Sequence, residues 1–179
     1  FGIDLGCMEC RLGETRNRIV IGGGNPKADY LFVGEAPGKN EDETGKPFAG
    51  AAGKLLDEML ERAGLTRDEI YITSVCKCRP PKNRNPKPDE IAACYPNLLK
   101  QIEVIKPKCI FTLGSFAIAT LTSEKRSMAE WQGMRPQVEI GDQEYLVHPL
   151  YHPAAVIYNR KLYDTFLESG DEIRTLIEG

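Results

Sequence analysis

The sequence lacks long apolar runs, an excess of positive charge and, with two exceptions, histidine. No stretch approaches the roughly 20 apolar residues that a membrane-spanning helix needs, so we expect no membrane segment. The N-terminus shows no basic stretch followed by an apolar core, so we predict no secretory signal and a cytoplasmic location. A formal net charge of −3 argues against a protein that coats nucleic acid. The two histidines are His148 and His152, and any imidazole chemistry must use one of them.

The pattern of apolar residues predicts one α/β domain that spans residues 1–179. Four short runs rich in β-branched and aromatic residues predict buried parallel strands. They lie at residues 29–34, 70–75, 108–114 and 144–148. Helical spacing predicts helices between and after them, at residues 50–63, 88–105, 115–121 and 161–178. This alternation predicts a three-layer α/β/α sandwich with a central four-stranded parallel sheet.

Unusual sequence follows each predicted strand. Ligands of open parallel sheets bind at the carboxyl ends of the strands, so we expect one crevice to collect these segments. The segments are Gly34–Gly38, Ser74–Pro81, Gly114–Phe116 and His148–Pro153. They bring together carboxylates, cations, a turn of small residues and a histidine.

The sequence contains six cysteines, more than isolated buried positions would explain. Without a secretory signal, disulfides are not expected. Cys7 and Cys10 form a Cys-x2-Cys pair, and Cys78 and Cys94 form a second, wider pair. Four thiolates in two pairs suit either a tetrahedral zinc ion or a [4Fe–4S] cluster, and scattered free thiols are the plain alternative. Cys76 competes with Cys78 for the third position, and we favour Cys78 because it precedes Arg-Pro-Pro and the basic loop.

The first crevice segment is rich in acids and leads to an isolated aromatic. Glu35 and Glu41 suit the polarisation of a water or the stabilisation of positive charge on a sugar. A solvated acidic turn is the alternative. Phe48 sits between turn residues, where it either stacks on a base or packs against the next helix.

The last crevice segment carries the histidines. His152 stands on a proline-restricted turn just after the fourth strand and is the better catalytic candidate, whereas His148 still lies within the strand. Val156, Ile157 and Tyr158 form an apolar tip beyond it, which is either core or a wedge for DNA. A run of five cations without an acid suits phosphate binding: Lys77, Arg79, Lys82, Arg84 and Lys87.

In combination, these motifs resemble the uracil-DNA glycosylase superfamily, specifically its thermostable, iron–sulfur-containing family four. The similarity rests on the order and spacing of three elements and covers nearly the whole chain. They are Gly34-Glu35-Ala36-Pro37-Gly38 with Glu41-Asp42, Lys77-Cys78-Arg79-Pro80-Pro81 with Asn83-Arg84, and His152-Pro153-Ala154-Ala155.

The resemblance implies a monomeric hydrolase that starts base excision repair on uracil-containing DNA, single- or double-stranded, beside the prokaryotic nucleoid. It implies a structural [4Fe–4S] cluster on Cys7, Cys10, Cys78 and Cys94. It implies catalytic roles for Glu35, Glu41, Asn83 and His152. It implies uracil binding by Ala36, Phe48, Ser74 and His152, and DNA contacts by Lys77, Arg79, Lys82, Arg84, Val156, Ile157 and Arg160.

Two positions depart from the family pattern. The family usually has Asn where this chain has Ser74, and that amide bonds uracil O4 and N3–H together; the shorter Ser hydroxyl puts specificity or rate in doubt. Tyr158 stands where a basic residue is common, and Arg160 is a substitute. Two other readings therefore stay open: a uracil-DNA binding module with weak turnover, and a zinc-bound α/β protein that acts on free nucleotides.

Overall fold

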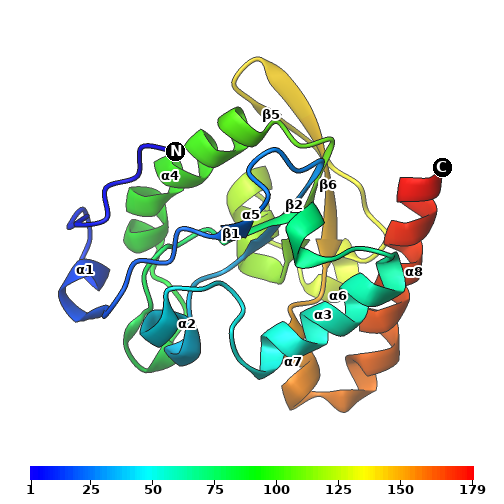
Figure 1. The fold of residues 1–179 in the computed structure, drawn as a ribbon, viewed down its shortest axis with the longest axis horizontal. Coiled ribbons are helices and arrows are strands. Elements are labelled where there is room, and N and C mark those ends of the chain that lie inside the picture. Colours follow the sequence, from blue (N-terminus) through cyan, green and yellow to red (C-terminus); the bar gives the residue numbers. More distant parts are fainter.

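A six-stranded sheet forms the centre of the structure, a computed structural model that describes residues 1–179 (Figure 1). The strand order is β1-β3-β2-β4-β6-β5. The strands are β1 (Gly23–Gly24), β2 (Tyr30–Gly34), β3 (Tyr71–Ser74), β4 (Cys109–Leu113), β5 (Gln137–Ile140) and β6 (Gln143–Leu150). The parallel set β3-β2-β4-β6 confirms the four predicted strands. None of the helices has the length and apolar character that a membrane span requires.

The predicted count of four strands is wrong because each edge of the parallel set carries an antiparallel strand. β1 pairs with β3, and β5 pairs with β6. β1 consists of two glycines, which give no hydrophobic signal. β5 is mostly exposed and joins β6 through a tight turn at Gly141, whose φ is +60°. Neither strand has the apolar run that marks a buried strand.

Eight α-helices surround the sheet. They are α1 (Leu12–Thr15), α2 (Lys39–Thr44), α3 (Ala51–Ala63), α4 (Pro88–Ile105), α5 (Ser115–Thr122), α6 (Met128–Trp131), α7 (Pro153–Tyr158) and α8 (Tyr163–Glu178). Short 3-10 turns lie at Arg67–Glu69, Pro81–Asn83 and Arg160–Leu162. The four predicted helices are confirmed as α3, α4, α5 and α8. The other four have at most six residues, too few to show a helical period.

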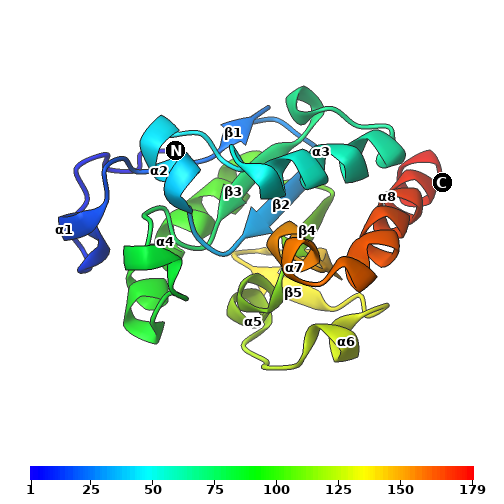
Figure 2. The same ribbon diagram turned by 90° about the horizontal axis from the view of Figure 1, so that it is seen from below.

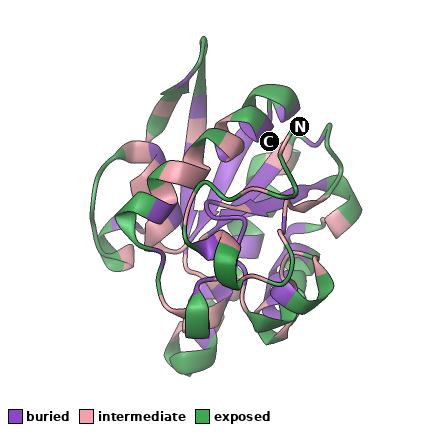
Figure 3. Cartoon of the chain, turned by 90° about the vertical axis from the view of Figure 1, so that its left-hand side faces the viewer, coloured by how far each residue is buried: buried purple, intermediate pink, exposed green.

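The helices form two layers, one on each face of the sheet (Figure 2). Successive residues of a strand point to opposite faces, and β2 shows this directly. Leu31 and Val33 join a core with α4, α5 and α6, whereas Phe32 joins a core with α3, α7 and α8. The buried strands lie between exposed outer helix surfaces (Figure 3). The predicted three-layer α/β/α arrangement is confirmed.

The segment that precedes β1 is tied to α2 by one buried carboxylate. Asp42 is 1% exposed. One of its oxygens accepts from the backbone N–H groups of Asn17 (2.8 Å) and Arg18 (3.2 Å), and the other accepts from Asn17 Nδ2 (2.7 Å). A buried carboxylate needs such donors, since ionised oxygens without partners are costly. Asp42 therefore fixes the N-terminal segment against the helix that also carries Glu41.

We predict that Asp42→Asn lowers the free energy of unfolding by about 1.5–3 kcal/mol, because an amide N–H₂ replaces an acceptor that faces N–H groups. Urea unfolding at neutral pH measures the change. The matched control is Asp142→Asn at the exposed β5–β6 turn, which should change stability by less than about 0.5 kcal/mol. Equal stabilities of the two variants would show that the Asp42 contacts contribute nothing.

Candidate active site

One cleft opens where the parallel strands end. Its volume is about 500 Å³, within the ordinary range for a small-molecule site. The register of the sheet pairs Gly34 of β2 with Ser74 of β3, and the segment after β6 returns beside them. The sequence-predicted residues that line the cleft are Glu35, Ala36, Glu41, Phe48, Ser74, Asn83, Arg84 and His152. Three of the four segments that were predicted to share a crevice contribute to this cleft, whereas Gly114–Phe116 does not line it, so the prediction is confirmed in part.

Glu35 supplies a carboxyl group without a protein partner. It follows β2 directly, and its side chain forms no hydrogen bond or ion pair within the protein. Burial raises the pKa of Glu35 to about 7, because a desolvated carboxylate is unfavourable. Next to it, the backbone N–H of Ala36 has no acceptor within the protein. This corner of the cleft therefore offers a titratable carboxyl group and a free amide donor.

Glu41 has both carboxylate oxygens occupied. Its Oε1 accepts from the N–H of Gly38 (2.9 Å) and its Oε2 from the N–H of Ala49 (2.7 Å). The carboxylate thus bridges the start of α2 and the loop before α3, which form one side of the cleft. This arrangement suits Glu41 to position these two loops, while Glu35 keeps its oxygens free.

Phe48 lies in a strained backbone conformation. Its φ is +48°, a left-handed value that costs a side-chain-bearing residue about 1–2 kcal/mol. Its ring stacks on the imidazole of His152, with ring centroids 5.6 Å apart and planes at 30°. A Cβ on Gly34 would meet the Phe48 ring at 3.0 Å, so only glycine lets the ring rest on the end of β2. Strain of this kind is concentrated at functional sites.

His152 is fixed in one neutral tautomer. It caps α7, and its Nδ1 accepts from the N–H of Ala154 at 3.0 Å, so the remaining ring proton is on Nε2. Burial lowers the pKa of His152 to about 4, which keeps the ring uncharged at neutral pH. Gly114, with a φ of +89°, gives the ring space because a Cβ there would meet the His152 Cβ at 3.1 Å. The imidazole is therefore a hydrogen-bond donor at the cleft.

His148 lies away from the cleft. As expected, it belongs to β6, where its ring contacts Phe111 at a centroid distance of 5.0 Å. Burial lowers the pKa of His148 to about 4 as well. Its position leaves His152 as the histidine of the site.

Ser74 ends β3 on the floor of the cleft. Its Oγ lies 3.3 Å from the point that a Cβ on Gly34 would occupy, and it has no hydrogen-bond partner within the protein. Its carbonyl oxygen accepts from the ammonium group of Lys77. The hydroxyl is therefore free to face a ligand.

The basic segment after β3 is less available than its sequence implies. Lys77 is fully buried, and its Nζ donates to Thr73 Oγ1 at 2.8 Å, so the prediction that it contacts DNA is wrong. Arg79 donates to the side-chain oxygen of Asn83 (2.6 Å), and Arg84 forms a two-pronged ion pair with Glu90 at 2.8 Å on both prongs. Lys82 and Lys87 are exposed and form no ion pair. These contacts hold Asn83 at the rim of the cleft.

The apolar tip after His152 is half core and half surface. Val156 is fully buried between α3 and α8, so the prediction that it contacts DNA is wrong: the second turn of α7 points it inward. Ile157 is 42% exposed and Arg160 is exposed, with its guanidinium over the ring of Tyr163. Tyr158 is 91% exposed and lines the cleft, which makes it the larger exposed surface of α7.

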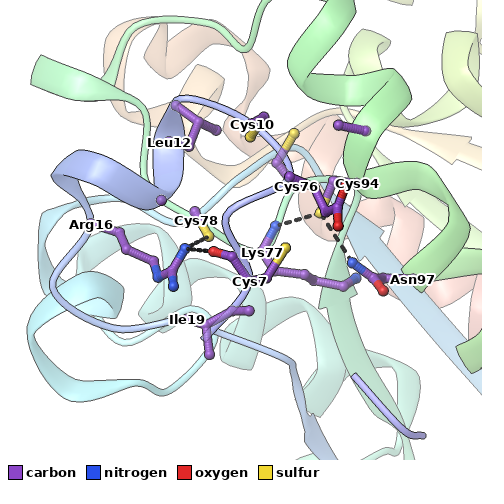
Figure 4. A pocket seen from close by; sticks show the side chains of 13 residues that line it. Cys7, Cys10, Leu12, Arg16, Ile19, Cys76, Lys77, Cys78, Cys94 and Asn97 are labelled. Carbon is purple, nitrogen blue, oxygen red and sulfur yellow. Dashed lines mark hydrogen bonds between the residues drawn. The ribbon is translucent and has the colours of Figure 1, made fainter. Parts of the chain in front are cut away.

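Five cysteines line a second, small cavity, shown in Figure 4. Cys7 and Cys10 come from the N-terminal segment, Cys76 and Cys78 follow β3, and Cys94 is in α4. No three metal-binding side chains converge closely enough to hold a single ion. Burial raises the pKa of Cys78 to about 11 despite the nearby Arg16 guanidinium, and burial also raises the pKa of Cys10.

Hydrogen bonds distinguish Cys78 from Cys76. Arg16 donates to Cys78 Sγ at 3.4 Å, and the Lys77 N–H donates to Cys94 Sγ at 3.3 Å. Cys76 is fully buried in the core with α4 and α5, and its sulfur receives no hydrogen bond. N–H donors toward sulfur are typical of iron–sulfur ligands. The chemistry of this cavity therefore fits thiolate ligation that includes Cys78.

Residues in and beside the cleft include some that the sequence did not predict. Lys39 and Asn40 of α2 line it, and Arg67 donates to three backbone carbonyls around Phe48. Lys39 and Asn40 could have been predicted, because they adjoin the acidic motif around Glu41 in the sequence. Nothing in the sequence around Arg67 distinguishes it from an ordinary surface arginine.

Comparisons with known proteins show the family of the chain. The family model described as the uracil DNA glycosylase superfamily matches residues 21–173. The type-4 uracil-DNA glycosylase of Sulfurisphaera tokodaii is 46% identical over 177 residues, which are 96% of this chain and 80% of the relative. The type-4 enzymes of Archaeoglobus fulgidus and Thermotoga maritima are 44% and 40% identical, over 90% and 96% of this chain and 83% and 90% of their own lengths. The chain therefore belongs to the uracil-DNA glycosylase superfamily, in the family of the type-4 enzymes.

Proposed function

We propose that this protein is a uracil-DNA glycosylase that starts base excision repair by hydrolysing the N-glycosidic bond of uracil in DNA. The observation that carries the proposal is the neutral, tautomer-fixed His152 at the end of a cleft that also holds the unpartnered carboxyl group of Glu35. As the bond breaks, negative charge develops on the base and positive charge develops on the sugar, until water adds to the sugar. His152 suits the first charge and Glu35 suits the second.

Substrate binding requires the uracil nucleotide to leave the base stack, since its glycosidic bond is inaccessible within a duplex. The cleft accepts the base beside the Phe48 ring, which stacks on it. The Ser74 hydroxyl and the free N–H of Ala36 face the polar edge of the base. These contacts recognise uracil and hold the C1′ atom of its deoxyribose near Glu35.

Bond cleavage then uses two groups with complementary roles. The Nε2–H of His152 donates to uracil O2, where negative charge grows as the bond breaks. Because the leaving base is stabilised as an anion, the histidine need not be protonated. The Glu35 carboxylate stabilises the oxocarbenium-like sugar and orients the water that attacks C1′. Glu41 holds the two loops around this arrangement, and Asn83 borders it.

DNA binding uses the exposed rim of the cleft. Lys82, together with Arg79 and Arg84, contacts the phosphates on one side of the cleft. On the other side, Ile157 and Arg160 enter the space in the DNA that the extruded nucleotide leaves. The protein acts as a monomer on single- or double-stranded DNA in the prokaryotic cytoplasm, at the nucleoid.

Cys7, Cys10, Cys78 and Cys94 would hold a structural [4Fe–4S] cluster in the cysteine cavity. The four thiols come in two pairs and line one cavity, as the ligands of such a cluster require. When bound, the cluster cross-links the N-terminal segment to α4 and the segment after β3. It takes no part in the hydrolysis.

A recognition module with weak turnover is the second candidate, and Ser74 is the observation that favours it. A serine forms fewer hydrogen bonds to the base edge than an asparagine. The free carboxyl group of Glu35 argues for hydrolysis, since recognition alone does not require it.

We predict that the rate of uracil release rises with pH through about 7, because the Glu35 carboxylate is the active form and burial raises its pKa to about 7. His152, with a pKa of about 4, is neutral throughout this range and adds no step. Glu35→Gln should lower the single-turnover rate at least about 100-fold and remove the step. Glu41→Gln should lower the rate but keep the step, since it disturbs loop position.

The substrate for this test is an oligonucleotide with a single uracil, and the matched control is Glu61→Gln on the exposed surface of α3, which should behave as wild type. A pH step that survives Glu35→Gln would transfer the carboxylate role to another group.

We predict that the protein purified without oxygen is brown and contains about four iron and four sulfide ions per chain. Cys78→Ser should lose most of the iron, whereas Cys76→Ser should keep it. Elemental analysis and visible absorbance measure both. One zinc ion per chain without iron, or iron loss confined to Cys76→Ser, would contradict the ligand set.

We predict that Ser74→Asn increases the preference for uracil over cytosine by about tenfold or more, because the amide pairs with both O4 and N3–H. Competitive excision from oligonucleotides that differ in one base measures the ratio. An unchanged ratio would mean that the backbone alone provides the selectivity.

A further inference from the structure

Arg67 lies outside the cleft but holds the segment that carries Phe48. It begins the 3-10 turn Arg67–Glu69 before β3, and its guanidinium reaches back to the loop before α3. Nη1 donates to the carbonyl of Pro47 at 3.0 Å, and Nη2 donates to the carbonyls of Phe48 at 2.8 Å and Gly53 at 3.1 Å. Three contacts from one side chain thus fix the backbone of the strained residue, the residue before it and the first turn of α3.

The approach of this loop to α3 leaves no space for adjustment. A Cβ on Gly53 would lie 1.8 Å from the carbonyl oxygen of Phe48 and 3.0 Å from Nη2 of Arg67. Close contacts therefore join the first turn of α3, the Phe48 carbonyl and the guanidinium of Arg67. With this carbonyl held, the left-handed φ of Phe48 directs its ring over Gly34 and toward His152.

Asp57 orients the guanidinium of Arg67. It lies on α3, and its Oδ1 accepts from Arg67 Nε at 2.6 Å. The planar guanidinium has five N–H donors in a fixed fork, which lets one residue serve a carboxylate and three carbonyls together. A lysine has a single ammonium and cannot reproduce this geometry.

We propose that Arg67 is a positioning residue of the base-stacking site: by holding the backbone of Phe48 in its left-handed conformation, it keeps the ring ready to stack on the extruded base. The inference deepens the proposed function and rests on it. Arg67 does not touch the substrate, and its effect passes through Phe48.

A double-mutant cycle tests this route. The variants are Arg67→Gln, Phe48→Ala and the combination, assayed for kcat and KM on a single-uracil oligonucleotide. Arg67→Gln should lower kcat/KM about 10- to 100-fold, because a shift of about 1 Å in a substrate-positioning group has effects of this size. In the Phe48→Ala background the same change should cost less than about threefold. Arg67→Lys should rescue only in part.

The matched control is Arg62→Gln. Arg62 is on α3 and pairs with Asp171 of α8 at the surface, so its loss should leave kcat/KM unchanged. If Arg67→Gln fails to fold, Asp57→Asn removes only the group that aims the guanidinium, and it should give a smaller loss that again disappears in the Phe48→Ala background.

A second readout does not depend on activity. In the wild-type protein, NMR should show cross-relaxation between the ring protons of Phe48 and His152, and Arg67→Gln should lose it while the rest of the spectrum stays folded. Equal effects of Arg67→Gln with and without Phe48 present, or a ring contact that survives the substitution, would overturn the inference. A wild-type protein that releases no uracil would instead overturn the proposed function, and the NMR comparison would still decide the role of Arg67.

Discussion

The parallel pairing of β2 with β3 and β4 is the constraint on which the rest of the structure depends. This register places Gly34 beside Ser74 and brings the end of β6 to the same edge. A shift of one residue would turn every side chain of β2 to the opposite face. Phe32 would then leave the core under α3, and Glu35 would no longer open into the cleft. The site is therefore a consequence of core packing.

Desolvation shifts the pKa values of the titratable groups at this edge of the sheet. The same physical cause raises the pKa of Glu35 and lowers that of His152, and in each case it favours the neutral form. For His152 a neutral ring is what the proposed donation requires. For Glu35 the shift brings the ionisation to near-neutral pH, where a modest change of environment converts acid to carboxylate. The segments around the cleft are in turn fixed by buried or strained contacts, such as those of Asp42 and Phe48.

The sequence allowed most of this architecture to be predicted, for identifiable reasons. The four parallel strands are continuous apolar runs, and α3, α4, α5 and α8 have recognisable faces or caps. The crevice followed from the carboxyl-end rule. β1 and β5 have no apolar run, and α2 and α7 are shorter than two helical turns. Lys77 and Val156 were misplaced because a charge in a basic run and a methyl-bearing residue in an apolar tip look the same whether they face inward or outward. The contacts of Arg67 arise only in three dimensions.

We propose that the cleft breaks a bond and does not merely recognise a base. The most direct measurement is the amount of free uracil released under single-turnover conditions from an oligonucleotide with one uracil, quantified by mass spectrometry beside the binding affinity for the same strand. We expect close to one free uracil per strand, with the strand left abasic. Tight binding of the uracil strand with no free base would contradict it.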